Sequence, residues 1–534
     1  MRKAVTFMVF ILVIILGACS SSTKTNESGT SGEEVNVNKE GYPIVDEELT
    51  MTLMAPGHGK AEWEDMPVMK EYKEKTNMDF EYNTPPADDF DTNLNLAFAS
   101  EDLDDIIYGA GTNNLTPGME IDYGSQDILL PLEDLIEEYA PNLQNLLEDR
   151  PDILKSITTI DGHIYSLPYV SYGHKARWGA SPIWFNGEWL DALNVEELPK
   201  TIDDFYDLLV RFRDEDPNGN GEADEIPLSG DGLNDIRTWL MGAFGLKDQD
   251  IEEVDGNVRY APITENYKEY LVYMNTLYED KLLDPEVFSH SSDQYNAKGQ
   301  ENQLGAFTTH HSYMVTGETE EESLNNPMFH PLTSPLTDEI MVPSGFDFSR
   351  GAFSLTKNNP NPAASIRWVD YFYTEEGGAY LDQGPEGYLW EWNEDKTKRE
   401  PLPLPEEFDS SEDYRATLTP AWGAITTPML NPPFEVKKEL SPIDHLTEEE
   451  TEEKLNPYSE TPYPQVYLTR EEQKEVNTIQ ADLESYVEQM EAKFITGVEP
   501  ISKWEDYVST IEEMNIDRYV EIHQDAYDRW DEGE

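Results

Sequence analysis

Oxygen-bearing side chains lie close together in the stretch 216–227, which reads DPNGNGEADEIP, and five of them have a spacing that could bind one ion. They are Asp216, Asn218, Asn220, Asp224 and Glu225. Calcium takes roughly six to eight oxygen ligands from carboxylates, amides and backbone carbonyls. The alternating positions 216, 218 and 220 can direct three side chains at one ion, and Gly221 permits the sharp turn of an EF-hand loop. Pro227 stands where an EF-hand has its bidentate Glu, so Asp224 and Glu225 would have to complete the coordination shell of the ion.

This spacing predicts a structural calcium site, because nothing near the loop resembles a nucleophile or a general base. The alternative is a turn that binds no metal, since Asn, Asp and Gly favour turns in any case. The number and spacing of the oxygen ligands favour calcium over that alternative.

The loop and the helix before it, which begins in the segment LPKTIDDF at 198–205, resemble the long extracellular solute-binding lipoproteins of ABC carbohydrate importers. LplA-like and alginate-oligosaccharide-binding proteins are the most similar types, and segments 494–497, 504–508 and 526–529 extend the resemblance almost to the last residue. The resemblance implies a calcium ion held by the five side chains above and the carbonyl of Gly221. It also implies an α/β, two-lobed periplasmic-binding-protein-like (type II) fold with an interlobe cleft and a hinge.

The amino terminus has the features of a lipoprotein signal. Arg2 and Lys3 precede an apolar run at 4–16, which is too short for an ordinary membrane-spanning helix. The sequence LGAC at 16–19 resembles the bacterial lipobox, so we expect a signal peptide at 1–18 and a lipid on Cys19. An incidental cysteine after a signal peptide is the alternative. Residues 19–45 have the composition of a flexible tether, which predicts a protein anchored on the extracellular face of the cytoplasmic membrane.

Composition excludes several classes of partner. The chain has 534 residues, with 109 acidic and 37 basic side chains and a net charge of −72. Nucleic acid and bare anionic membrane would be repelled by this charge. The single cysteine excludes internal disulfides, and a chain of this length predicts at least two domains.

Hydrophobic periodicity predicts alternating strands and helices near the start of the chain. We expect strands at 49–55, 79–82 and 105–109 and helices at 65–75 and 93–99, an order typical of an α/β domain. Thr201, Thr469 and Ser502 are expected to cap three later helices. From the resemblance, we place the N-lobe at 46–170 plus 290–355 and the C-lobe at 171–289 plus 356–534.

Aromatic side chains are candidates for ligand contacts, because sugar rings stack on aromatic faces and polar groups bond their hydroxyls. Tyr388, Trp390 and Trp392 alternate and would share one face of an extended segment. Arg177 could compensate an acidic sugar, and Asn186 stands where many relatives carry Arg. Packing in a hydrophobic core is the alternative for each aromatic. The predicted ligand-binding residues are Trp63, Arg177, Trp178, Trp184, Asn186, Tyr313, Tyr388, Trp390, Trp392 and Trp422.

No catalytic motif stands out in the sequence. The pair His310–His311 lacks a third ligand at metal-binding spacing, and no nucleophile elbow, Walker loop or dinucleotide fingerprint occurs. We therefore expect a monomeric, non-enzymatic lipoprotein that captures oligosaccharides, preferably neutral ones, and delivers them to an ABC permease. A secreted glycoside hydrolase with two facing carboxylates and a cell-surface adhesion module are the alternatives.

Overall fold

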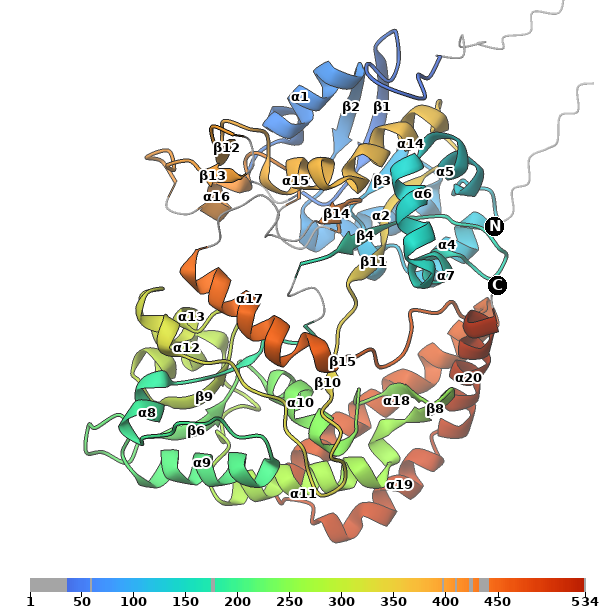
Figure 1. Ribbon diagram of the computed structural model, residues 1–534. Coiled ribbons are helices and arrows are strands. Elements are labelled where there is room, and N and C mark those ends of the chain that lie inside the picture. The colour runs from blue at the N-terminus through green and yellow to red at the C-terminus, as the bar shows by residue number, and fades with distance from the viewer. Residues whose placement is uncertain are drawn as a thin grey trace, which may run out of the picture.

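The computed structural model of the chain describes residues 36–57, 60–173, 178–395, 398–408, 411–421, 426–431 and 441–532. These residues form two lobes, one above the other in Figure 1, and each lobe has its own hydrophobic core. Both lobes combine a sheet with surrounding helices. The two-lobed α/β architecture predicted from the sequence is therefore confirmed.

A six-stranded sheet forms the centre of the first lobe, with strand order β14-β4-β11-β3-β1-β2. Its strands are β1 (Leu49–Met54), β2 (Met78–Asn83), β3 (Ile106–Tyr108), β4 (Leu167–Ser171), β11 (Phe348–Leu355) and β14 (Leu430–Asn431). Only β11 is antiparallel to its neighbours, so the other five strands run in one direction. The carboxyl ends of those five strands lie at the same edge of the sheet.

Helices and one hairpin surround this sheet. The helices are α1 (Pro67–Thr76), α2 (Phe90–Ser100), α3 (Gly111–Asn114), α4 (Pro117–Gly124), α5 (Glu133–Tyr139), α6 (Pro141–Asp149), α7 (Pro151–Ile157), α14 (Pro362–Asp370), α15 (Glu375–Gln383) and α16 (Ser411–Arg415). The hairpin pairs β12 (Trp390–Trp392) with β13 (Arg399–Pro401). Tyr72 of α1 donates a hydrogen bond to the carbonyl of Trp368 of α14 at 2.8 Å, which joins two helices that are far apart in the sequence.

A three-stranded sheet, β5-β9-β6, forms the centre of the second lobe. The strands of this lobe are β5 (Ile183–Phe185), β6 (Ile226–Ser229), β7 (Ile251–Val254), β8 (Asn257–Tyr260), β9 (Leu304–Thr308), β10 (Val342–Pro343) and β15 (Ser459–Glu460). The central β9 is parallel to β6 and antiparallel to β5. The carboxyl ends of β6 and β9 therefore share an edge with the amino end of β5.

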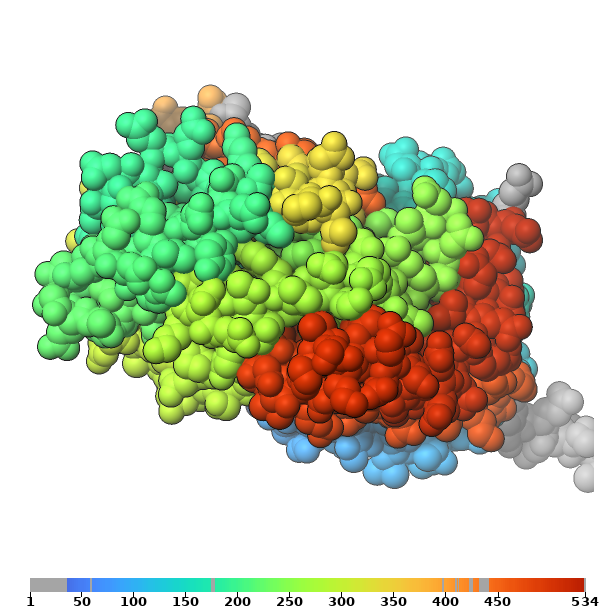
Figure 2. Space-filling view, turned by 90° about the horizontal axis from the view of Figure 1, so that it is seen from below, coloured from blue at the N-terminus to red at the C-terminus, as the bar shows by residue number. Residues whose placement is uncertain are grey.

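The helices of the second lobe come from two separate parts of the chain. They are α8 (Gly187–Ala192), α9 (Ile202–Asp214), α10 (Leu233–Met241), α11 (Glu265–Glu279), α12 (Ser292–Gln300), α13 (Tyr313–Thr316), α17 (Pro442–Lys454), α18 (Arg470–Ile495), α19 (Trp504–Glu512) and α20 (Ile516–Glu532). Figure 2 shows the carboxyl-terminal helices in red, packed beside the yellow-green part of the same lobe. The apolar stripe of α18 supplies Val476, Leu483 and Val487 to this core.

The chain passes between the lobes three times. It leaves the first lobe after β4, returns between β10 and β11, and leaves again between β14 and α17. Trp178 and Ser344, which lie on two of these passages, form an antiparallel bridge. In the first lobe, all three passages therefore meet the sheet at the edge where its five parallel strands end.

These passages correct the predicted lobe boundaries. Residues 290–342 were expected in the first lobe, but β9 pairs with β5 and β6, and Tyr295 belongs to the second core. Residues 356–431 were expected in the second lobe, but Trp368 and Leu381 belong to the first core, and β14 pairs with β4. The residues of an apolar strand do not indicate which sheet the strand joins, so the sequence alone could not assign β9 and β14 to a lobe.

Two of the three predicted caps are confirmed. Thr201 accepts a hydrogen bond from the backbone of Asp204, and Thr469 forms a capping box with Glu472. The Ser502 cap is wrong, because α19 begins at Trp504 without a side-chain cap. None of the helices in the described part of the chain combines the length and the apolar character needed to cross a bilayer.

Candidate functional site

The facing sheet edges define the first candidate site. Each lobe directs the carboxyl ends of its parallel strands toward the interlobe passages, as the topology above requires. In open α/β sheets, ligands bind in the crevice outside the carboxyl ends of the strands. In the first lobe this edge includes Gly57 and Pro86, which form a bridge, and the exposed ring of Tyr172. In the second lobe it includes Asp231 and His310, which follow β6 and β9.

Hydrogen bonds fix the second-lobe edge. The backbone N–H of Asp231 donates to Oγ1 of Thr308 at 3.3 Å, which ties the end of β6 to the end of β9. The Tyr295 hydroxyl donates to the Thr308 carbonyl at 2.7 Å, and Ser292 donates to Oδ2 of Asp231 at 3.1 Å. Two residues of helix α12 therefore bind the ends of β6 and β9 through hydrogen bonds.

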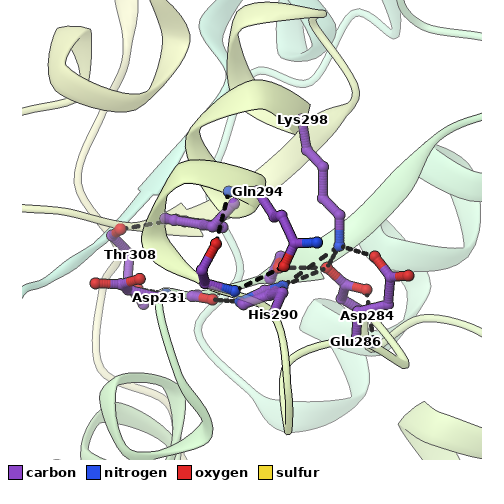
Figure 3. Close-up of polar contacts among 11 residues, drawn as sticks. Asp231, Asp284, Glu286, His290, Gln294, Lys298 and Thr308 are labelled. Carbon is purple, nitrogen blue, oxygen red and sulfur yellow. Dashed lines mark hydrogen bonds and ion pairs between the residues drawn. The ribbon is translucent and has the colours of Figure 1, made fainter.

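An ionic cluster, in which Asp284 and Lys298 are largely buried and Glu286 is exposed, lies beneath the same edge (Figure 3). Lys298 Nζ lies 2.8 Å from both Asp284 Oδ2 and Glu286 Oε2. Burial opposes ionisation of Asp284, but the hydrogen bonds that it accepts, led by that of Lys298, leave its pKa below the ordinary value. The cluster joins the β6 end, the segment before α12, and α12 itself.

Ser229 and His290 also belong to this cluster, but they do not form a nucleophile–base pair. Ser229 donates to Oδ2 of Asp284 at 2.7 Å, whereas Nε2 of His290 lies 2.9 Å from the carbonyl of Gly230. A carbonyl can only accept, so Nε2 carries the proton and cannot activate the serine. These contacts indicate that Ser229 and His290 stabilise the edge of the second-lobe sheet.

Aromatic rings gather where β9 meets the passages. The Trp178 ring lies 5.2 Å from the exposed His310 ring, edge to face, and Tyr313 stacks on His311 at 5.7 Å. His311 turns the other way, toward Thr447 of α17, with Nδ1 3.2 Å from its Oγ1. Trp178 and Tyr313 therefore remain candidates for ligand contact, and His310 is a further candidate beside them. Its position directly after an apolar strand was the available signal.

Three other residues that were predicted to contact the ligand are buried and have structural roles instead. Trp63 is 2% exposed and packs on Tyr108, and Trp184 is fully buried and donates to the Thr309 carbonyl at 2.9 Å. Asn186 caps α8 and donates to Asn302 at 2.8 Å. We assign these three residues to the fold, because none of them presents a free face to the edge. Arg177, Trp422 and Cys19 lie outside the described residues.

A cavity of about 590 Å³ lies at the hinge and is lined by both lobes. The first lobe contributes Pro117 and Arg350, and the second lobe contributes polar residues such as Asp250 and His523. The Arg350 guanidinium lies 4.3 Å from the Tyr467 ring centroid, and the Tyr467 hydroxyl donates to the buried carboxylate of Glu120. These contacts join the first lobe to the segment that leads into α18.

The hairpin aromatics lie in a different pocket. Trp390 and Trp392 line a cavity of about 450 Å³, and all of its lining residues belong to the first lobe. Tyr388 is half-buried on the segment before β12. Sequence reasoning missed Arg399, which lines the same cavity. Its pairing with Trp392 across the hairpin is visible only in the structure.

The loop at 216–225 has a compact, polar geometry. Asp216, Gly219 and Gly221 have positive φ angles of 48°, 70° and 79°, which fold the loop back on itself. The side-chain amides of Asn218 and Asn220 donate to Oδ1 of Asp224 at 3.3 and 2.9 Å. Hydrogen bonds from Asn220 and then Gln303 hold the pKa of Asp224 below its ordinary value. Three of the five predicted side-chain ligands, Asn218, Asn220 and Asp224, are therefore joined by hydrogen bonds.

One buried oxygen in this loop fits a cation. Oε1 of Glu225 is buried without a hydrogen-bond partner among the described residues. Burial raises the pKa of Glu225, and the neighbouring carboxylates of Asp224 and Asp216 add to the effect. Within the described ranges, no three His, Cys, Asp or Glu side chains gather closely enough to hold a metal alone. Binding here would therefore depend on the Asn side chains and on backbone oxygens as well.

Comparisons with known proteins extend over most of the chain. The profile of the family described as bacterial extracellular solute-binding protein matches residues 57–379. The fructooligosaccharide ABC transporter substrate-binding protein FusA of Streptococcus pneumoniae serotype 4 is 28% identical, over 97% of this chain and 96% of its own. The structure of S. pneumoniae FusA in complex with kestose has a TM-score of 0.71 at 26% identity and covers 91% of this chain and 100% of that chain. The structure of alginate-binding protein AlgQ2 without calcium ion has a TM-score of 0.66 at 20% identity, with 91% and 99% covered, which shows a shared fold.

Proposed function

Because this chain belongs to the bacterial extracellular solute-binding protein family, we propose that it captures an oligosaccharide outside the cell and delivers it to the permease of an ABC transporter. The observation that carries this proposal is the pair of facing sheet edges, one on each lobe, joined by three passages of the chain. Such an arrangement can close around a ligand like a hinge. A relative that spans nearly the whole chain and is named for fructooligosaccharides supports an oligosaccharide as the ligand class.

The ligand lies between the two edges in this proposal. Trp178 and Tyr313 offer aromatic faces to sugar C–H surfaces, and His310 and Asp231 offer hydrogen-bonding groups. Trp390 and Trp392 line a pocket of the first lobe alone, so we assign them no contact with the sugar held between the lobes. A strongly acidic chain favours neutral oligosaccharides over uronates.

The loop at 216–225 holds a structural calcium ion in this proposal. Asp216, Asn218, Asn220, Asp224 and Glu225 supply side-chain oxygens, and Gly221 supplies a carbonyl. The unpartnered Oε1 of Glu225 supports this role. Rotation of the two Asn amides by half a turn would replace their nitrogens by oxygens. The ion would neutralise part of the loop's charge and fix the end of α9.

The mature protein is a monomeric lipoprotein in this proposal, anchored through Cys19 on the extracellular face of the cytoplasmic membrane. Residues 19–45 would then act as the tether. The apolar run and the lipobox-like LGAC sequence support this arrangement. The anchor would keep the binding lobes near the permease.

A thermal-shift panel tests the proposal. The purified chain is heated with neutral oligosaccharides, including kestose, and with oligogalacturonates, and each sugar is then analysed by chromatography. We expect at least one neutral oligosaccharide to raise the melting temperature and to be recovered intact. Cleavage of that sugar would instead indicate a hydrolase, and a panel without any stabilising oligosaccharide would contradict the ligand class.

A further inference from the structure

The pocket behind the β12–β13 hairpin is separate from the interlobe edges. Its walls come from α1, α15, the segment between α14 and α15, and the hairpin. Tyr72 and Lys75 lie in the second half of α1, which ends where β2 begins, and so they lie toward the sheet edge opposite the carboxyl ends. A second cavity of about 520 Å³ adjoins it, and the two cavities share Trp390 and Arg399 as lining residues.

Arg399 is unusual among the described residues. It is 8% exposed, and its guanidinium lies 5.1 Å from the ring centroid of Trp390. No hydrogen bond or ion pair connects it to another described residue, and its Nε is buried without a partner. Burial lowers the pKa of Arg399, against the attraction of Asp382. Buried charged donors are normally paired, so this side chain indicates an acceptor that none of the described residues supplies.

Aromatic rings form the walls around Arg399. Trp390 and Trp392 are half-buried, and their rings are nearly perpendicular, at 86°, with centroids 5.5 Å apart. Tyr380 and the buried Tyr72 line the same cavity. One indole can therefore offer its face while the other offers its edge, an arrangement that suits the C–H face of a sugar ring.

Carboxylates surround the mouth of the pocket. Glu71, Glu375, Glu376 and Glu386 are exposed lining residues. Lys75 partly offsets them, but its Nζ lies over the Tyr42 and Tyr371 rings at 4.3 and 4.1 Å. The four carboxylates oppose an anionic ligand and can accept hydrogen bonds from hydroxyl groups. A neutral polyhydroxylated ring satisfies both the donors inside and the acceptors at the mouth.

We propose that this pocket is a second carbohydrate site, which binds a neutral sugar ring on the first lobe alone. The ring stacks on Trp392 or Trp390, its oxygens accept hydrogen bonds from Arg399, and its hydroxyl groups donate to the carboxylates at the mouth. All of the lining residues belong to one lobe, so binding here does not require the lobes to close. The proposal therefore goes beyond the capture of an oligosaccharide between the lobes.

Fluorine NMR on the full chain labelled with 5-fluorotryptophan tests this site. The resonances of Trp390, Trp392 and Trp178 are assigned by their loss in the matching Trp→Phe variants. Glucose, galactose, mannose and fructose are the neutral probes, and galacturonic acid is the acidic probe. We expect a neutral hexose to shift the hairpin resonances. Arg399→Gln and Arg399→Lys should weaken that binding roughly tenfold, as for one lost charge-assisted hydrogen bond.

Controls separate this site from the interlobe site. Arg518→Gln removes an exposed guanidinium elsewhere and should leave the hairpin response unchanged. Trp178→Ala should also leave it unchanged, and the Trp178 resonance reports separately on oligosaccharide binding between the lobes. The resonances of the other tryptophans show whether each variant is folded. The proposal is overturned if no neutral hexose moves a hairpin resonance, if only galacturonic acid does, or if Trp178→Ala abolishes the response.

Discussion

Gln303 donates a hydrogen bond from Nε2 to Oδ2 of Asp224 across 3.0 Å, and so connects the loop at 216–225 to the start of β9. The amide of Asn218 also reaches the carbonyl of Asn302 at 3.4 Å. Strand β9 begins at Leu304 and ends at Thr308, on the edge that faces the first lobe. The proposed calcium loop and the proposed ligand edge therefore lie at the two ends of one five-residue strand.

Removal of calcium should destabilise the second lobe. We expect EGTA to lower the melting temperature by several degrees and added calcium to restore it, because an ion that binds only the folded state stabilises it by mass action. Asp216→Ala should abolish the response. Glu222→Ala is the matched control, since Glu222 lies in the same loop but outside the proposed ligand set. An unchanged melting curve in EGTA would show that the loop is a metal-free turn.

Loss of the Trp178 ring should weaken the binding of the oligosaccharide between the lobes. Trp178→Ala removes the ring that packs against His310, and we expect roughly tenfold weaker binding of the captured oligosaccharide. Isothermal titration calorimetry measures the change. Tyr139→Ala, which alters a half-buried ring of α5 in the first lobe, should bind as tightly as the unaltered chain. Equal affinity of the Trp178 variant would place the sugar elsewhere.

The buried ion pair between Arg237 and Glu491 should be essential for stability. The two groups are 2.6 Å apart, and their side chains are 8% and 2% exposed. Glu491→Gln leaves the Arg237 charge buried without its partner, so we expect a loss of about 3–5 kcal/mol in the free energy of unfolding. Glu475→Gln breaks the exposed pair with Arg518 and should cost less than about 1 kcal/mol. Denaturant titration compares the two variants, and equal losses would contradict this assignment.

His523 should make stability depend on pH. Burial lowers the pKa of His523 to about 4, and neither ring nitrogen has a hydrogen-bond partner among the described residues. Since its pKa in the folded state is below the ordinary value of 6.5, its contribution is present above pH 6.5 and is lost as the pH falls toward 4.

His523→Phe removes this titration and keeps an aromatic ring beside Tyr519 and Tyr463. The free energy of unfolding of the unaltered chain should fall relative to that of the variant as the pH drops from 6.5 to 4. The relative change should be on the order of 2–3 kcal/mol. Parallel curves for the two proteins over this range would contradict a neutral, buried His523.

The sequence was most informative where the signal is local. The caps at Thr201 and Thr469 depend on residues three positions apart, and alternation of apolar residues placed β1 and β2 within one residue of their observed bounds. Long-range pairing left no such mark, so β9 was assigned to the wrong lobe. The proposed calcium ligands also lie close together in the sequence, within residues 216–225, and could therefore be proposed as one set.

The aromatic ligand contacts were harder to predict. Trp178 and Trp184 flank the same passage, yet one lies beside the exposed His310 ring and the other is fully buried. The continuous apolar run of β5 was a signal for burial of Trp184. Arg399 could not be recognised, because the lack of a partner for its guanidinium among the described residues becomes apparent only in the folded structure.

A distance measurement between the two lobes tests whether they close around the captured oligosaccharide. In a Cys19→Ser background, spin labels replace the exposed Met314 of the second lobe and the exposed Leu404 of the first lobe. Pulsed electron resonance then measures their separation with and without the stabilising oligosaccharide, and labels at Met314 and Leu336, both in the second lobe, provide the control. We expect the oligosaccharide to shorten the distance between Met314 and Leu404 and to leave the distance between Met314 and Leu336 unchanged. Saturating sugar that leaves the interlobe distance unchanged would contradict capture by closure of the two lobes.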